Sequence, residues 1–206
     1  MFGALVVMAL IGMVWLAVAL MERHWSRQAK LERDHLDQTM RGVLATRAAS
    51  DANWNWETIS ADLGAKLVTF FEELSTGEIS RSREFVCANF LDLQIDDLRE
   101  CARKGKAYAT AIRRIKRMIP MGIDEGNGEL PLLNVWVLCE FDFHLEDVQF
   151  NRRNGTVSGR ADHMNAEMYV VLQLLKGRWW IWSLQRFDQV VDEMLAHEKR
   201  IAKSDN

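Results

Sequence analysis

The first twenty-one residues contain no charged side chain, whereas the rest of the chain mixes charged and apolar residues. As a helix, the stretch from Phe2 to Met21 would be about 30 Å long, which matches the hydrocarbon core of a bilayer. We therefore expect residues 1–21 to form a transmembrane anchor. The alternative is a cleaved secretory signal, which would begin with basic residues and end with small ones. Here no Lys or Arg comes first, and bulky Leu20 and Met21 stand at the end.

Several basic residues follow the apolar stretch closely, namely Arg23, His24, Arg27, Lys30 and Arg33. Lys and Arg next to a single span prefer the cytoplasmic side of the membrane. The pattern predicts a single-pass protein of a bacterial inner or mitochondrial inner membrane, with the remaining residues in the cytoplasm or the matrix.

The remaining residues are enough for one domain of ordinary size, because the whole chain has 206 residues. Residues 22–50 are rich in charge and carry one short apolar stripe, Leu36, Met40 and Val43, which is too brief for a coiled coil. We interpret them as a charged, solvated helical stalk. The domain then occupies residues 51–206.

Helical signals come first in this domain. The stretch Asp51–Trp56 supplies helix caps, and Thr76-Gly77 supplies a helix end. Between them, apolar residues at helical spacing define one buried face: Leu63, Leu67, Phe70, Phe71 and Leu74. Two short helical stretches are predicted next, around Ser80–Leu91 and from Gln94 onward. A last helix is predicted from Gln189 to about Lys203.

From Leu132 the apolar period changes to two, which is typical of a half-buried strand. Its apolar side alternates through Val135, Val137, Cys139, Phe141 and Phe143. Further strands are predicted over Met168–Leu175 and Arg178–Phe187, on either side of a Lys176-Gly177 turn. Helices followed by an antiparallel meander indicate an α+β fold, with the sheet curled over the helices.

One region, residues 98–119, fits two interpretations. Its apolar residues recur about every three and a half positions, as in an amphipathic helix. Gly105 weakens a helix there, and we favour a strand from about Thr110.

The order of these segments resembles a known family. The stretches that carry the resemblance are FFEELSTGEIS, FVCANFLDLQIDDLRE and RRNGTVSGRADHMNAEMYVVLQLLKGRWWIWSLQRF. Over residues 54–188 they look like the Tim-forty-four-like domain, a member of the cone-shaped nuclear-transport-factor-like fold. The resemblance depends on the Asn154–Gly159 segment ahead of a long strand and on a last strand opening at Arg178-Trp179. It implies helices packed on a curved antiparallel sheet, a first strand starting near Tyr108, and a role in binding.

Charge is concentrated between Arg99 and Arg117. Eight of the 26 Lys and Arg residues but one of the 29 acidic residues lie there, so the segment carries +7 and the rest of the chain −10. The basic residues are Arg99, Arg103, Lys104, Lys106, Arg113, Arg114, Lys116 and Arg117. Such a block favours an anionic partner, namely lipid headgroups, RNA or an acidic protein surface. The alternative is a solvated face that nearby carboxylates neutralise, from Glu72, Glu73, Asp92, Asp96 or Asp97.

Few residues suggest chemistry. Glu140, Asp142 and His144 share one strand face near His163, but the opposite face carries the apolar residues, so we expect these side chains to face solvent. The three cysteines, Cys87, Cys101 and Cys139, lie in apolar contexts without a ligand-like spacing and suit a reducing compartment. We predict no catalytic residue, metal or cofactor, and no phosphate-binding loop or nucleophile motif is present.

Four tryptophans belong to the predicted sheet, and Trp180 and Trp182 of the last strand are candidates for a protein interface, because Trp dominates binding hot spots. A C-terminal helix or a second copy of the chain would be an alternative cover for them. The leading interpretation is a non-enzymatic membrane tether or scaffold that recruits a protein partner. The resemblance implies protein translocation, membrane-protein biogenesis or assembly of an inner-membrane complex. Two other interpretations stay open: a cone-fold enzyme or small-ligand binder, and a scaffold subunit of a secretion apparatus.

Overall fold

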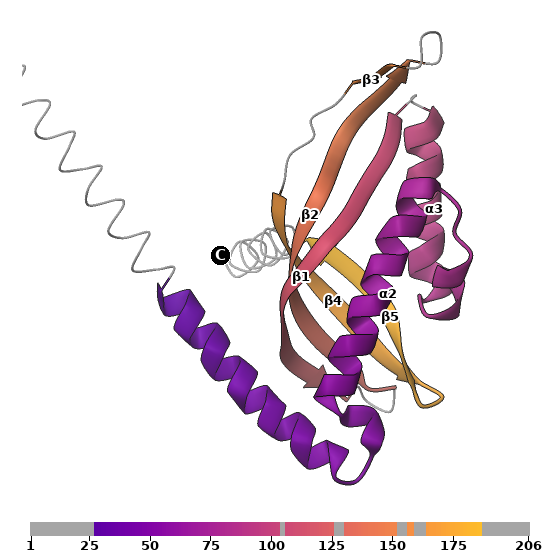
Figure 1. Cartoon of the computed structure of the whole chain (residues 1–206). Coiled ribbons are helices and arrows are strands. Elements are labelled where there is room, and N and C mark those ends of the chain that lie inside the picture. Colours follow the sequence, from indigo (N-terminus) through magenta and orange to yellow (C-terminus); the bar gives the residue numbers. More distant parts are fainter. Residues whose placement is uncertain (1–26, 104–105, 126–129, 152–155, 159–163, 187–206) are drawn as a thin grey trace, which may run out of the picture. The chain divides into compact units, whose positions relative to one another are not determined.

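The computed structural model describes residues 27–103, 106–125, 130–151, 156–158 and 164–186 (Figure 1). The predicted anchor and the predicted C-terminal helix lie outside these ranges. Within them, no helix is both long and apolar enough to cross a membrane. The chain divides into two compact units, Met1–Thr39 and Met40–Asn206.

One helix covers residues 27–48, in agreement with the helix predicted for residues 22–50. From Met40 onward this helix belongs to the second unit, where Leu44 is fully buried in the hydrophobic core. The end of the helix is therefore part of the fold and is not a solvated stalk. The second unit begins before residue 51, where the sequence pattern places the start of the domain.

The next elements are the 3-10 turn η1 (Ala52–Trp54), helix α2 (Trp56–Thr76), the 3-10 turn η2 (Arg81–Glu84) and helix α3 (Ala88–Arg103). Asn55 caps α2, because its Oδ1 accepts a hydrogen bond from the backbone N–H of Thr58 at 2.9 Å. Gly77 ends α2 in the left-handed conformation, with φ at 74°. Both predicted ends of α2 are thus confirmed. The two short helices predicted next are instead η2 and one continuous helix, α3.

The strands form one antiparallel sheet in the order β1-β2-β4-β5, so the α+β class is confirmed. They are β1 (Lys106–Asp124), β2 (Leu132–Asn151), β3 (Thr156–Ser158), β4 (Met164–Leu175) and β5 (Arg178–Arg186). The first part of β2 pairs with β4, and its end pairs with the short β3. Lys176 and Gly177 both have positive φ and make the predicted tight turn between β4 and β5.

Residues 98–103 belong to α3, but residues 106–119 are strand, so the helical interpretation is wrong for this second part. The apparent helical period has a physical cause in the bulges of β1. Ile112, Ile115 and Met118 face the core opposite Phe141, Cys139 and Val137 of β2. Each bulge inserts one extra residue, at Arg113 and at Lys116, and the apolar residues therefore recur every three positions instead of every two.

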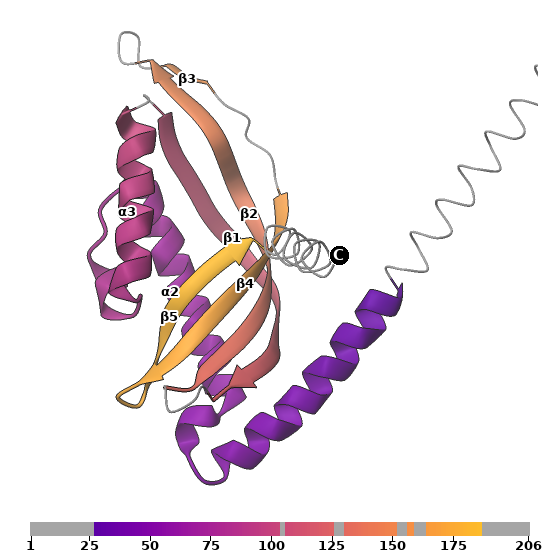
Figure 2. The ribbon, with the colours of Figure 1, turned by 180° about the vertical axis from the view of Figure 1, so that it is seen from behind.

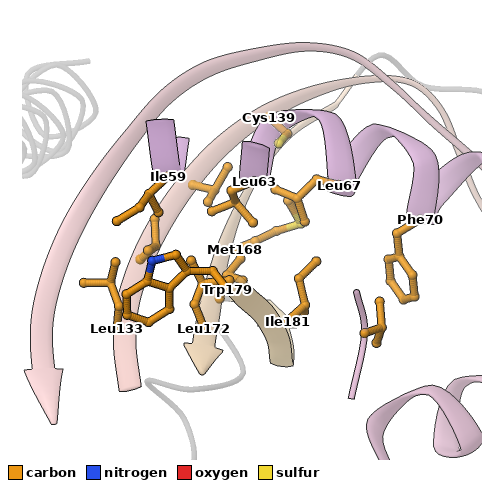
Figure 3. Packing of buried hydrophobic residues seen from close by; sticks show 14 of the residues in the cluster. Ile59, Leu63, Leu67, Phe70, Leu133, Cys139, Met168, Leu172, Trp179 and Ile181 are labelled. Carbon is orange, nitrogen blue, oxygen red and sulfur yellow. The ribbon is translucent and has the colours of Figure 1, made fainter. Parts of the chain in front are cut away.

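Helix α2 covers one face of the sheet. It runs in front of the strands in Figure 1 and behind them in Figure 2. Its predicted apolar residues are buried, and the close view shows Leu63, Leu67 and Phe70 directed toward the strands (Figure 3). Opposite them lie core residues of β2, β4 and β5, including Leu133, Met168, Leu172 and Ile181. Each large apolar side chain buried in this way contributes about 1.5–3 kcal/mol.

The opposite face of the sheet is only partly polar. Trp136 lies between the inward-facing residues Val135 and Val137, so the period of two predicts that it faces solvent. It is instead 3% exposed, and its register neighbour Ile119 is fully buried. The indole Nε1 of Trp136 donates a hydrogen bond to Glu167 Oε2 at 3.0 Å. The alternation correctly places Val135, Val137, Cys139 and Phe141 inside, but it does not anticipate burial on the other side.

Candidate binding surfaces

The predicted basic segment is divided between two elements. Arg99 and Arg103 lie on α3, where each pairs with a carboxylate three residues earlier, Asp96 and Glu100. These arginine side chains are about three-quarters exposed, and such surface pairs contribute little. The α3 part of the segment is therefore a solvated, ion-paired helix face. Lys104 and the side chain of Lys106 lie outside the described residues.

The other basic residues lie on β1 and form what we call the β1 basic cluster: Arg113, Arg114, Lys116 and Arg117. Three of them converge on the carboxylate of Glu140 on β2. Their nitrogen-to-oxygen distances to it are 3.1 Å for Lys116 Nζ, 3.4 Å for Arg114 Nη2 and 3.7 Å for Arg113 Nη1. Strict alternation would put Arg113 and Arg114 on opposite faces. The bulges of β1 bring both within reach of one carboxylate.

Glu140 is thus a counter-ion of this cluster. Of the carboxylates predicted to neutralise the basic segment, Asp96 contacts Arg99 on α3, whereas Glu72 and Glu73 contact Arg81. The hydrogen bond from Lys116, together with the charges of Arg114 and Arg113, lowers the pKa of Glu140. Lys116 Nζ also donates to Asn165 Oδ1 at 2.6 Å. One carboxylate thus faces three cations.

A groove of about 780 Å³ separates the exposed side of α2 from β1. Small residues of α2 line it on one side, namely Ser60, Ala61, Gly64 and Ala65. On the other side lie Ile112–Met118, which include the β1 basic cluster. A Cβ built on Gly64 would lie 3.5 Å from both Ile115 Cδ1 and Met118 Cε, so the floor of the groove is apolar. The basic residues of β1 also line the groove. Three of them reach Glu140 on the face of the sheet away from α2, so they lie along the β1 edge, which we call the rim.

A second surface lies between β5 and α3. Trp182 is 40% exposed and Leu93 is 64% exposed, and both line a groove of about 520 Å³. Trp180 lines a different cleft, of about 440 Å³, beside Asn53 and Lys66. The predicted interface pair therefore lies in two separate places. Leu93 is a neighbour of Trp182 that no sequence pattern indicates.

The cleft beside Trp180 is held together by direct contacts. Lys66 Nζ lies 2.6 Å from Asp62 Oδ2 and donates to the Trp179 carbonyl at 2.6 Å. The indole Nε1 of Trp179 donates to the Asn53 carbonyl at 2.7 Å, and the ring meets Trp54 edge-on at 5.0 Å between centroids. These polar groups join η1, α2 and β5, and we assign them a structural role.

Glu73 has a structural role of a similar kind. It is 4% exposed and accepts hydrogen bonds from the backbone N–H groups of Ser80, Arg81 and Ser82, at 3.3, 2.8 and 2.8 Å. Burial alone would raise its pKa, but the hydrogen bonds from Ser82, Arg81 and Ser80 lower it to about 2. Glu73 therefore fixes the turn after α2 and does not neutralise the basic segment.

The residues considered for chemistry are only partly described. The described residues include no group of three or more His, Cys, Asp or Glu side chains that could hold a metal ion. The side chains of Asp142 and His144, and all of His163, lie outside the described residues. Cys139 is fully buried, and burial raises its pKa to about 12. Its thiol is a small core side chain, as predicted.

Comparison with known proteins identifies no family. No family model matches the chain, and no curated protein matches it. The crystal structure of the intermembrane space region of the chloroplast protein ARC6 is similar to 63% of this chain and 94% of that chain. Its identity is 12% and its TM-score 0.39, a similarity that supports neither a family nor a function.

Proposed function

We propose that this chain is a single-pass membrane protein whose α+β domain recruits a partner protein to the membrane face. In this proposal residues 1–21 are the anchor, and the domain is a cone-shaped fold of the Tim-forty-four-like type. One observation carries the proposal: an uncharged stretch the length of a span is followed by a helix, residues 27–48, that ends with Leu44 in the core of the domain. The core of the second unit thus includes the end of the helix that follows the proposed anchor in the sequence.

Membrane attachment can be tested by alkaline carbonate extraction of cells that express the full chain. The full chain should stay in the membrane pellet, because an uncharged stretch of this length is stable across a bilayer. A variant that lacks residues 2–21 should be extracted and should still be folded. Extraction of the full chain, or a mature mass that reveals cleavage near Met21, would refute the anchor and favour a secretory signal.

The orientation can be tested with a cysteine added after Asn206 and an impermeant thiol reagent. The basic residues after the span predict that this cysteine is labelled only when the membrane is broken. Labelling in intact cells or mitoplasts would place the domain on the opposite side.

Partner recruitment can be tested by affinity capture from membranes solubilised in detergent. We expect Trp182 and Leu93 to contribute to an interface, because they are exposed apolar neighbours beside a groove. The double variant Leu93→Ser/Trp182→Ser should lose a captured partner, whereas the control Leu130→Ser, at a site that is 43% exposed, should keep it. Equal capture by both variants would exclude this surface.

A further inference from the structure

The two edges of the sheet differ in how they are covered. The β5 edge is paired with the chain itself at Ile181, because Cys87 N–H donates to the Ile181 carbonyl and Ile181 N–H donates to the Phe85 carbonyl, both at 2.8 Å. In the described part of the chain, β1 pairs with β2 alone. The groove beside α2 runs along this other edge, so a partner would find a strand edge and a helix face next to each other.

The chemistry of the groove is amphipathic. Ile115 and Met118 lie at its floor beside Gly64. Arg113 and Arg114 are 57% and 67% exposed at its rim. Its lining also includes Arg41, Lys116 and Arg117 and one acid, Glu57. The carboxylate of Glu140 adds a second negative charge next to the rim. A ligand that matches this lining has apolar groups for the floor and negative charges for the rim.

We propose that this groove binds an extended acidic segment of a partner protein, in which acidic and apolar side chains alternate. Successive side chains of an extended segment point to opposite sides, so one set reaches the apolar floor while the other reaches the basic rim. Arg is suited to this role, because its guanidinium binds a carboxylate through two parallel hydrogen bonds. The inference rests on the recruiting role proposed above and names the partner's chemistry at the β1 groove.

Two other anionic partners fit the groove less well. A bilayer surface is broad, whereas the apolar floor lies in a concave site between a helix and a strand. Single-stranded RNA is usually held by aromatic side chains on which its bases stack. Among the residues that line the groove, Trp56 is the one aromatic residue, and it is 4% exposed.

The test measures fluorescence anisotropy of a fluorescein-labelled 12-residue peptide of alternating Glu and Val with the full chain in non-ionic detergent. We expect saturable binding that weakens at least fivefold between about 50 and 300 mM salt, because screening shortens the range of the charges. A peptide of alternating Lys and Val should not bind. A peptide of alternating Glu and Ser should bind more weakly, because it cannot fill the apolar floor.

Two double variants test where on the domain the peptide binds. Arg113→Gln/Arg114→Gln removes two rim charges but keeps the contact between Lys116 and Glu140, and it should weaken binding at least tenfold. The matched control, Arg99→Gln/Arg103→Gln, removes the same charge from α3 and should change affinity less than twofold.

A third variant, Ala65→Trp, fills the groove from the exposed side of α2 without changing any charge. It should also abolish peptide binding while the melting temperature stays within a few degrees of the wild type. Unchanged affinity in both Arg113→Gln/Arg114→Gln and Ala65→Trp would overturn the proposal.

Titrations with an anionic membrane and with RNA test the two other anionic partners. Phosphatidylcholine vesicles with 30% phosphatidylglycerol and a 12-nucleotide oligouridine are titrated under matched salt. Tighter binding of either than of the peptide, with the same sensitivity to Arg113→Gln/Arg114→Gln, would refute an acidic protein segment. This assay does not depend on membrane insertion, so a chain that resists carbonate extraction but ignores the peptide would refute this inference and leave the anchor intact.

Discussion

Replacing Leu44 by alanine tests whether the helix of residues 27–48 is built into the folded unit. Leu44 is fully buried in the same cluster as Leu63 and Trp179. The substitution removes three carbon atoms, which corresponds to about 2.4 kcal/mol of transfer free energy at 0.8 kcal/mol for each group. The cavity left behind adds to this, and buried Leu→Ala changes cost about 2.7–5 kcal/mol in total. We expect a loss of about 3–4 kcal/mol.

Such a loss is measurable by thermal unfolding of the full chain in non-ionic detergent, followed by the fluorescence of buried tryptophans. For a domain of this size 1 kcal/mol corresponds to about 2–4 °C, so the melting temperature should fall by about 6–16 °C. The matched control is Val43→Ala, one residue away in the same helix, where the side chain is 39% exposed. Its effect should stay within about 0.5 kcal/mol.

Equal melting temperatures for Leu44→Ala and Val43→Ala would refute the reasoning. The helix end would then be a stalk, and the domain would begin near residue 51. The expected result instead implies that a soluble fragment starting at residue 51 is less stable than one starting at Met40, because the shorter fragment lacks Leu44.

Two further predictions concern buried titratable groups. The pKa of Glu73 in the fold is about 2, below the ordinary value of 4.5. Its stabilisation, on the order of 3 kcal/mol, is therefore present above about pH 4.5 and is lost as the pH falls toward 2. In urea unfolding, Glu73→Gln should lower the free energy of unfolding at pH 7 by about 2 kcal/mol and flatten this acid dependence. The control Glu72→Gln should do neither. An unchanged dependence of stability on pH in Glu73→Gln would contradict the hydrogen bonding of Glu73. For Cys139, burial raises the pKa to about 12. In a Cys87→Ser/Cys101→Ser background, a thiol reagent should therefore label Cys139 only when the chain unfolds. Rapid labelling of the folded chain would contradict its burial.

The sequence is sufficient to predict α2 and β2, because their signals are local. The Asn55 cap and Gly77 determine where α2 begins and ends, and the period-two pattern of β2 places Val135, Val137 and Cys139 inside. The tertiary structure adds no constraint that opposes these preferences. Local propensity and global fold agree at these elements.

The bulges of β1 could not be predicted, because a bulge is a property of two strands and not of one. It depends on which residues of β2 lie opposite, and that register is decided by the core as a whole. The role of Glu140 could not be predicted for the same reason. Its position after Cys139 shows only that it is on the polar side, and its three cations come from a strand that precedes it by more than twenty residues.

The burial of Leu44 shows a different limit. Leu36, Met40 and Val43 form the visible stripe of the helix, but the fully buried residue is their neighbour. A pattern this short cannot define a helix face, because one additional contact decides which side is buried. That contact comes from the core residues of the second unit, far away in the sequence.

The distribution of charge leads to the strongest argument about function. The +7 of residues 99–117 is continuous in sequence but is not one surface in the fold. On α3, each arginine has its own carboxylate within one helical turn, and exposed pairs of this kind contribute only a few tenths of a kcal/mol. On β1, three cations share Glu140 beside an apolar groove. An anionic partner therefore gains more from the β1 basic cluster than from α3. If affinity for the acidic peptide depends equally on both parts, net charge alone explains it, and the groove has no special role.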